Sequence, residues 1–487
     1  MHYLVLSFLY ILNFTPAHGE CLNNKKGLQA DIVGVLLEQA VTCPQDVQDL
    51  KKILEEDGLN TLPAMVANRG AHNPVKGSFS LFESVTGSSA SLKKMILPEH
   101  FYFGHFTTLD SDNNLMLDQT SFPNKLLIEV IAYDFKKEVY NFYELVGTNS
   151  GPKWFYRGDS FDIYEDNKNL KVQNDSGFGS RLRCSACHSS GGPIMKELAP
   201  PHNDWWIEEN KLSFGSNDLS QELKGYVSKF IDASVFSQNV QKGMVLLEKK
   251  KILFSRNMKE KLRPLFCTTE INLVSDLLPL SSPSKLISIP SEVFVDPLLA
   301  GDETLSMPKE YYVRALKDLK SQFPETELLD ADHAFLVPVR SVINHLHVKQ
   351  LISEGLIDEE FALDVLSIDF KNPMFSKSRC GLLKFLPEGN NWKEEFKMNL
   401  YGANTKVEIE IAQKLETNNK NEHRLLAKNH LREKQAEWMD AESVKSEVIF
   451  LNNLRTSVFN DAISKNPKGQ ILEPGFRVIF PLFKGKI

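Results

Sequence analysis

The chain has 487 residues, with 56 Lys and Arg against 63 Asp and Glu, so its formal net charge is −7. Apolar residues make up 42% and charged residues 24%, a composition that indicates a folded globular protein and excludes disorder, collagen and a long coiled coil. Because the small acidic excess is scattered along the chain, we expect no nucleic-acid partner. No apolar run after residue 14 is long enough to span a bilayer, so we expect no transmembrane anchor.

The first 19 residues have the pattern of a secretory signal peptide. Residues from Tyr3 to Phe14 are almost all apolar, which is the length of a signal's hydrophobic region and too short to cross a bilayer. Ala17 and Gly19 are small residues at the positions that a signal peptidase checks, which predicts cleavage before Glu20. Since no Lys or Arg precedes the apolar run, a buried N-terminal helix is the alternative. We expect a periplasmic or secreted protein of the cell envelope, without a lipid anchor.

Further along the chain, the hydrophobic pattern changes from helical to strand-like. Residues 26–57 repeat apolar side chains with the period of two helices, interrupted near Pro44 and Asp46. Residues 78–165 carry short runs of Phe, Tyr, Val and Ile between turn residues, which predicts an antiparallel meander of about five strands. Residues 110–114 resemble the start of a calcium loop but lack its later Gly and Glu, so we interpret them as a hairpin turn.

The remaining sequence is mainly helical in pattern. Helices are predicted in residues 219–264, at about 311–323 and 348–356, and in a charged stretch at 405–464, with a strand at 334–339. Because strands and helices are segregated along the chain, we predict an α+β fold. It would have a β-rich N-terminal part, a loop-rich motif region and a mostly helical C-terminal half. The predicted divisions are a signal peptide at 1–19, a helical lead-in with a β-rich domain at 20–165, a motif region with following helices at 166–265, and a mainly helical domain at 266–487.

Four of the six cysteines are isolated in the sequence. The favoured pairing is Cys21 with Cys43 and Cys267 with Cys380. The first bridge would close a short N-terminal loop and contribute about 3 kcal/mol in the chain-entropy model. The alternative is that some of these cysteines are buried thiols.

The other two cysteines form a C-x-x-C-H motif, Cys184-Ser185-Ala186-Cys187-His188. Thiols at this spacing reach the two vinyl groups on one edge of a haem, and the following imidazole becomes the proximal iron ligand. A redox dithiol usually lies in a thioredoxin-like unit, a zinc site needs further ligands nearby, and a disulfide across so short a loop is strained. The motif therefore predicts one covalent haem c, held by Cys184, Cys187 and His188.

These motif residues resemble c-type cytochromes. The longer stretch from Trp154 to Leu198, with residues 334–382, resembles a group of large, uncharacterised exported bacterial proteins that carry one haem c motif. The resemblance implies covalent haem, a proximal His188 and a redox role. A single motif departs from the pattern of di-haem peroxidases. Trp154, Trp205 and Trp206 bracket the motif and are candidates to cover an apolar haem face, with ordinary core packing as the alternative.

The sequence does not identify the ligand on the far side of the iron. Met195, His202 and His333 are the candidates, and none has the placement in sequence that is typical of a distal ligand. We therefore hypothesise a sixth position that is weakly held or empty, so that the reduced protein binds carbon monoxide. Arg157, Arg181 and Arg183, near the motif in sequence, could pair with haem propionates or with surface acids.

Three functions are compatible with these observations. Electron transfer or redox sensing comes first, because it is the commonest use of a single haem c. The second is a mono-haem enzyme of the oxygenase or peroxidase type, whose large non-haem part forms a substrate pocket. The third is a non-catalytic envelope scaffold with a structural haem. The sequence does not identify the redox partner protein or small-molecule substrate.

Overall fold

The computed structural model describes most of the chain, with several gaps around the motif. The described residues are 21–22, 30–68, 79–109, 115–116, 126–168, 184–185, 188, 190–193, 203–205, 225, 228–254, 257–268, 270–274, 283–301, 303–319, 337–403, 405–416, 420–465 and 477–478. The fold is α+β, with a sheet-rich N-terminal region and a helical C-terminal half, as the sequence predicted.

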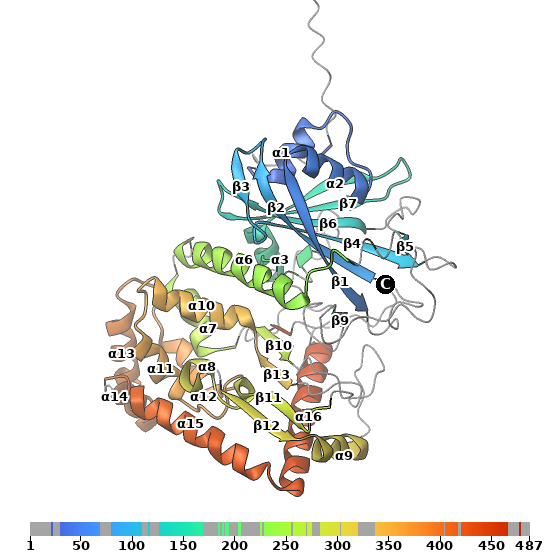
Figure 1. Cartoon of the computed structure of the whole chain (residues 1–487). Helices are drawn as coiled ribbons and strands as arrows, with labels where there is room; N and C mark the ends of the chain where they lie inside the picture. The colour runs from blue at the N-terminus through green and yellow to red at the C-terminus, as the bar shows by residue number, and fades with distance from the viewer. Residues whose placement is uncertain are drawn as a thin grey trace, which may run out of the picture.

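An antiparallel sheet forms the centre of the N-terminal region (Figure 1). Its strand order is β8-β7-β6-β4-β2-β1-β9, with β3 paired to β2 and β5 paired to β4. The predicted meander is confirmed, whereas β1, β3 and β9 were not predicted. The strands are β1 (Leu59–Asn68), β2 (Phe79–Ser89), β3 (Lys94–Ile96), β4 (Phe101–Leu109), β5 (Leu115–Met116), β6 (Leu126–Asp134), β7 (Val139–Val146), β8 (Lys153–Asp159) and β9 (Asn203–Trp205). Leu109 of β4 pairs with Leu115 of β5, whereas residues 110–114, for which the sequence predicts a hairpin turn, lie outside the described residues.

Two short helices, α1 (Ile32–Gln39) and α2 (Val47–Glu56), cover one face of this sheet. Both begin at an aspartate whose side chain accepts a backbone N–H of the first turn, Asp31 from Gly34 and Asp46 from Asp49. Their apolar sides join strand residues in a buried cluster that we call the α1/α2 core. The two predicted helices and the break between them are therefore confirmed.

The opposite face of the sheet packs against α3 (Ser160–Lys168) and the long helix α6 (Ala233–Phe254). In Figure 1, α6 lies between the sheet and the helices of the C-terminal half. Apolar residues of the sheet, of α6 and of the motif form a second buried cluster, the α6 core, which includes Phe142, Cys184, Met244 and Leu247. Cys184, the first residue of the motif, thus lies within the packed layer between the sheet and α6.

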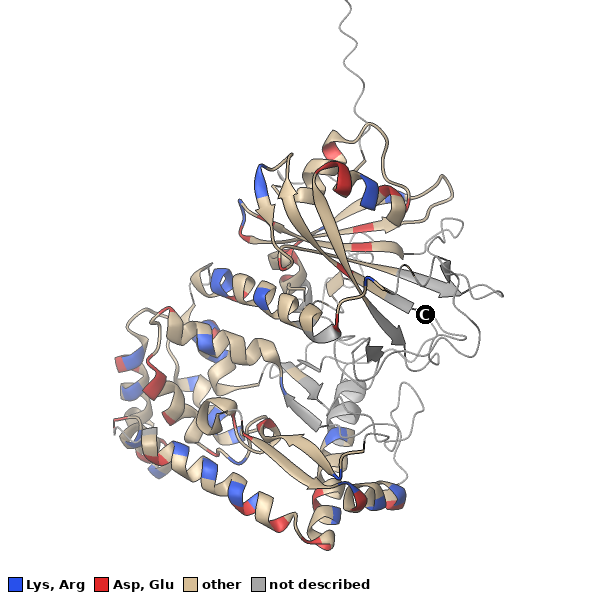
Figure 2. Ribbon diagram, viewed as in Figure 1, with Lys and Arg blue, Asp and Glu red and all other residues tan. Residues whose placement is uncertain are grey.

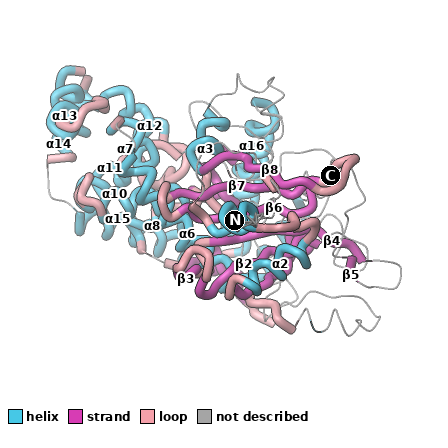
Figure 3. The backbone as a smooth tube through the Cα atoms, turned by 90° about the horizontal axis from the view of Figure 1, so that it is seen from above, coloured by secondary structure: helices cyan, strands magenta, loops and turns pink. Residues whose placement is uncertain are grey.

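The C-terminal half packs helices around two small sheets. In the view from above in Figure 3, most of its helices lie to the left of the larger sheet, whereas α16 overlaps it. Trp438, at the turn between two long helices, is fully buried there, as its apolar setting in the sequence suggested. The predicted charged stretch divides into three helices rather than one. The elements are α7 (Met258–Phe266), α8 (Pro297–Ala300), α9 (Lys309–Leu319), α10 (Val342–Ser353), α11 (Glu359–Ser367), α12 (Lys377–Gly381), α13 (Trp392–Gly402), α14 (Lys406–Lys414), α15 (Lys420–Glu437) and α16 (Ala441–Lys465), with strands β10 (Glu270–Val274), β11 (Leu286–Pro290), β12 (Thr304–Pro308), β13 (Val337–Arg340) and β14 (Arg477–Val478).

Both predicted disulfides are present. Cys21 is bonded to Cys43 and Cys267 to Cys380, so the favoured pairing is confirmed and the bridges use cysteines outside the motif. None of the helices in the described ranges combines the length and apolar character that crossing a bilayer requires. Charges of both signs alternate along the outer helices, as Figure 2 shows for α15. The division into three domains stays a prediction.

Candidate functional site

The strand register places two acidic residues side by side beneath the motif. Glu129 of β6 is directly opposite Glu144 of β7, and because side chains alternate along a strand, both project to the α6 face. Phe142, two residues before Glu144, shares that face. Gly104 of β4 is opposite Glu129 on its other side, and the ring of Phe82 covers the space that a side chain there would take.

Two described residues of the motif, Cys184 and His188, aim their side chains at these strands. The backbone N–H of His188 donates to the carbonyl of Cys184 at 2.7 Å, and that of Gly191 donates to His188 at 2.8 Å. Cys184 and His188 are therefore held one helical turn apart, on the same side of the backbone. Both side chains are buried, with Cys184 1% exposed and His188 0%.

Both ring nitrogens of His188 have partners. Nδ1 lies 2.8 Å from the carbonyl oxygen of Gly192, and Nε2 lies 2.9 Å from Oε1 of Glu129. A carbonyl oxygen can only accept, so Nδ1 carries a proton and donates it to Gly192. The ring of Phe142 packs against the imidazole with centroids 5.5 Å apart. The arrangement fixes the orientation of the ring and aims Nε2 at a carboxylate rather than at apolar side chains.

A buried ion pair lies next to the histidine. Nε of Arg157, on β8, donates to Oε2 of Glu144 at 2.6 Å, with the two side chains 10% and 1% exposed. Sγ of Cys184 lies 3.9 Å from the other oxygen of Glu144. The Arg157 guanidinium also stacks on Phe155, 4.5 Å from the ring centroid. Arg157 therefore pairs with a buried acid, rather than with the surface acid that was one of its two expected partners.

A second polar cluster ties the motif turn to the C-terminal half. Nζ of Lys251 donates to the carbonyl of Ser190 at 3.2 Å and to Oε1 of Glu248 at 2.6 Å. The other oxygen of Glu248 lies 2.8 Å from Nδ1 of His347 on α10, whose Nε2 lies 2.7 Å from the Lys261 carbonyl. Burial alone would raise the pKa of Glu248, but the Lys251 charge and the His347 hydrogen bond outweigh it and lower the pKa to about 2.

This cluster should make stability depend on pH in the acid range. Because the pKa of Glu248 is lower in the folded chain than its ordinary value of 4.5, its stabilising contribution is complete above about pH 4.5 and is lost as the pH falls towards 2. Thermal melts of the native sequence and of Glu248→Gln between pH 7 and pH 3 test this. The difference in melting temperature between them should shrink as the pH falls, and a constant difference would contradict the assignment.

The turn after the motif requires glycine at position 191. Gly191 has a φ of +78°, and a Cβ there would stand 2.2 Å from the backbone carbonyl oxygen of Ser160. Gly191→Ala should therefore destabilise the protein by about 2 kcal/mol or more in denaturant unfolding. Gly355→Ala is the matched control, because Gly355 has a φ of +68° with no atom within 4 Å of the added Cβ. Equal losses for the two variants would show that the close approach at Gly191 has no effect.

The structure tests only part of the site that the sequence predicted. It brings Cys184 and His188 together, while Cys187, Met195, His202 and His333 lie outside the described residues.

The suggestion that Trp154 covers a haem is wrong. Trp154 belongs to the α1/α2 core on the other face of the sheet, and its indole N–H donates to the Pro44 carbonyl at 2.8 Å. The strand register determines the face on which Trp154 lies. Trp154 pairs with Leu145 of β7, and Leu145 points to the opposite face of the sheet from its neighbour Glu144.

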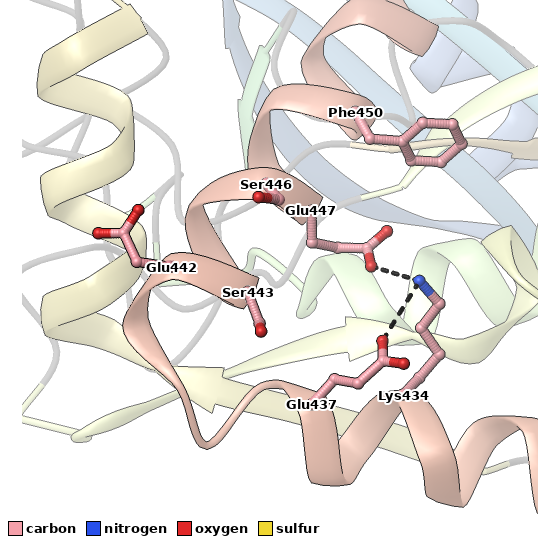
Figure 4. Close-up of a pocket in the computed structure, with 7 residues that line it drawn as sticks. All are labelled: Lys434, Glu437, Glu442, Ser443, Ser446, Glu447 and Phe450. Carbon is pink, nitrogen blue, oxygen red and sulfur yellow. Dashed lines mark hydrogen bonds and ion pairs between the residues drawn. The ribbon is translucent and has the colours of Figure 1, made fainter.

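Two other clusters of polar side chains, one in a surface pocket and one on the α1/α2 face of the sheet, do not form a site comparable to the one around His188. A surface pocket of about 460 Å³ lies at the corner of α15 and α16 (Figure 4), where Lys434 Nζ contacts Glu447 at 2.5 Å and Glu437 at 3.9 Å. On the α1/α2 face, Glu83 lies 2.9 Å from His105 and 2.6 Å from Lys51. Burial alone would raise the pKa of Glu83, but these two partners lower it to about 2, so the group acts as a buried ion pair.

Comparison with known proteins does not identify a family. No family model, no curated protein and no solved structure matches the chain. Among the described residues, no group of three His, Cys, Asp or Glu side chains is arranged to hold a metal ion. The functional argument therefore depends on the motif and on its surroundings in this fold.

Proposed function

We propose that this chain is an exported haem c protein that acts in electron transfer or redox sensing. Cys184 and Cys187 would hold the porphyrin through thioethers, and His188 would ligate the iron. The observation that carries the proposal is the C-x-x-C-H sequence in a turn whose first cysteine and histidine face the same strip of sheet. Haem c supplies a one-electron couple whose potential depends on its axial ligands and surroundings.

The hydrogen bonding of His188 suits the role of an iron ligand. A ligating histidine almost always donates its second ring N–H to a carbonyl, carboxylate or water, which fixes the ring and raises its basicity. The Nδ1–H of His188 has this partner in Gly192, so Nε2 is the nitrogen that would ligate. Glu129, now on Nε2, has a side chain that is 20% exposed and can give way to a metal ion. The hydrogen bond of Nδ1 therefore suits an iron ligand, but in this structure Nε2 is in direct contact with Glu129, and this contact leaves no space for a porphyrin between the two side chains.

The disulfides agree with an exported protein. Two bridges in one chain are typical of proteins that fold in an oxidising compartment, which is also where haem c attachment takes place in the proposal. The predicted signal peptide and the bacterial cell envelope location belong to the same proposal. The resemblance to large exported bacterial proteins with one haem c motif points in the same direction.

Haem attachment gives the direct test. The chain, expressed with its N-terminal segment and haem-maturation machinery, should keep a haem-stained band on a denaturing gel. The double variant Cys184→Ala/Cys187→Ala should lose the band, and each single variant should keep a weaker one through the remaining thioether. Loss of all haem from the native sequence on denaturation would overturn covalent attachment.

A mono-haem enzyme is the second candidate. It is favoured by the polar strip beside His188, where Glu129 offers an acid–base group and Arg157 a buried cation within one small region. Carbon monoxide distinguishes the two functions. Prompt binding to the reduced protein favours ligand or oxygen chemistry, whereas a low-spin, six-coordinate iron that ignores carbon monoxide favours simple electron transfer.

A further inference from the structure

We infer that His347 is a proton-dependent clamp, which as an imidazolium holds α10 to both α6 and α7 and which releases one of these contacts when it loses a proton. The clamp lies between the two regions of the fold, because α6 packs on the sheet and α10 packs on α6 (Figure 1). The inference concerns the folded chain itself, so it does not depend on the proposed haem c function.

The first argument is that both ring nitrogens of His347 face acceptors. Nδ1 lies 2.8 Å from Oε2 of Glu248 on α6, and Nε2 lies 2.7 Å from the carbonyl oxygen of Lys261 on α7. A carbonyl oxygen and an ionised carboxylate have no proton to donate, so each contact needs a proton on the ring. Only the imidazolium carries both protons, whereas a neutral ring can make one of the two hydrogen bonds at a time.

The second argument is that Glu248 stays ionised wherever a histidine titrates. Burial alone would raise the pKa of Glu248, but the Lys251 charge and the His347 hydrogen bond lower the pKa to about 2. Histidine ordinarily changes its charge between pH 5 and pH 8. Loss of a proton from His347 would therefore set an unprotonated nitrogen against a buried acceptor, which costs the hydrogen bond and leaves that acceptor without its donor.

Charges of both signs lie on the elements that pack against His347. They are Glu248, Lys249 and Lys251 of α6, Lys259, Glu260, Lys261 and Arg263 of α7, Glu270 of β10, and His345 and Lys349 of α10 itself. Glu248 is the acid bonded to the ring, whereas Glu260 pairs with Arg263 on its own helix. Burial lowers the pKa of His345 to about 4, so His345 carries no charge where His347 is expected to titrate.

The third argument is that the clamp shares its carboxylate with the turn after the motif. Nζ of Lys251 donates to Oε1 of Glu248 and to the Ser190 carbonyl, and it lies 4.9 Å from the ring centroid of Tyr164 on α3. One buried acid thus joins this turn and α6 to the C-terminal half. Because the folded contact needs the protonated ring, its stabilising effect is present at low pH and is lost as the pH rises.

Amide hydrogen exchange of the full chain at pH 6 and pH 9, corrected for the intrinsic effect of pH on exchange, tests the clamp. In the native sequence, protection of α10 and of the C-terminal end of α6 should fall by about tenfold or more between these pH values. His347→Asn, which is neutral at every pH and too short to reach both acceptors, should show the lower protection at both. His347→Gln, also neutral, covers the case in which the asparagine variant does not fold.

His345→Asn is the matched control, because His345 lies two residues away on the same helix and is neutral across this range. It should keep the pH dependence of the native sequence. Equal protection of the native chain at both pH values would overturn the inference, as would a pH dependence that survives substitution at position 347. Loss of the pH dependence in His345→Asn as well would also overturn it, because the effect would then not belong to His347.

Discussion

Replacing His188 by alanine should leave haem bound to the protein but change the visible spectrum of the iron strongly. The thioethers through Cys184 and Cys187 do not need the imidazole, whereas the iron loses its proximal ligand. The variant also leaves the Gly192 carbonyl and the Glu129 carboxylate without their present partner in a buried site. Absorption spectra of both oxidation states, together with haem staining after denaturation, measure the two effects separately.

His430→Ala is the control for this variant. His430 lies on α15, distant in the fold from the motif, and its ring packs against Phe370. Its removal should leave the haem spectrum as it is. A spectrum of His188→Ala that matches the native one would remove His188 from the iron, and the proposed site with it.

Replacing Glu144 by alanine should cost about 3–5 kcal/mol of stability, because removing one member of a buried ion pair leaves the other charge uncompensated. Arg157 would lose its 2.6 Å contact in a setting where it is 10% exposed, and Cys184 would lose a polar neighbour. Chemical denaturation gives the free energy of unfolding.

Two further variants show whether the ion pair itself is responsible. The double variant Glu144→Ala/Arg157→Ala should lose clearly less than the sum of the single variants, since no unpaired charge remains. Glu138→Ala, which breaks the exposed pair with Lys250, should leave stability almost unchanged. Additive losses at positions 144 and 157 would show that the two side chains act independently.

Local chemistry explains the parts of the fold that the sequence predicted well. The break near Pro44 and Asp46 became the gap between α1 and α2, because Asp46 caps the second helix and its pattern restarts there. The strands β2, β4, β6, β7 and β8 follow alternating or continuous apolar runs. The strand β1 was missed because Leu59–Asn68 directly follows α2 and contains Pro63, a residue that disfavours strands.

The surroundings of the motif were not predictable in the same way. Glu129 and Glu144 lie 59 and 44 residues before His188, and only the register of β6 and β7 brings them beneath it. A signal was nevertheless present, because each is a charged residue inside a mainly apolar strand, and a buried charge needs a partner. The sequence shows that such residues require partners but does not show which partner each one has.

The measurement that tests this account most directly is the intact mass of the exported protein under denaturing conditions. The account predicts the mass of a polypeptide that begins at Glu20 and carries one covalently bound haem, and loss of the haem increment in Cys184→Ala/Cys187→Ala. A mass equal to that of the polypeptide alone, from protein made with active haem-maturation machinery, would contradict the central claim.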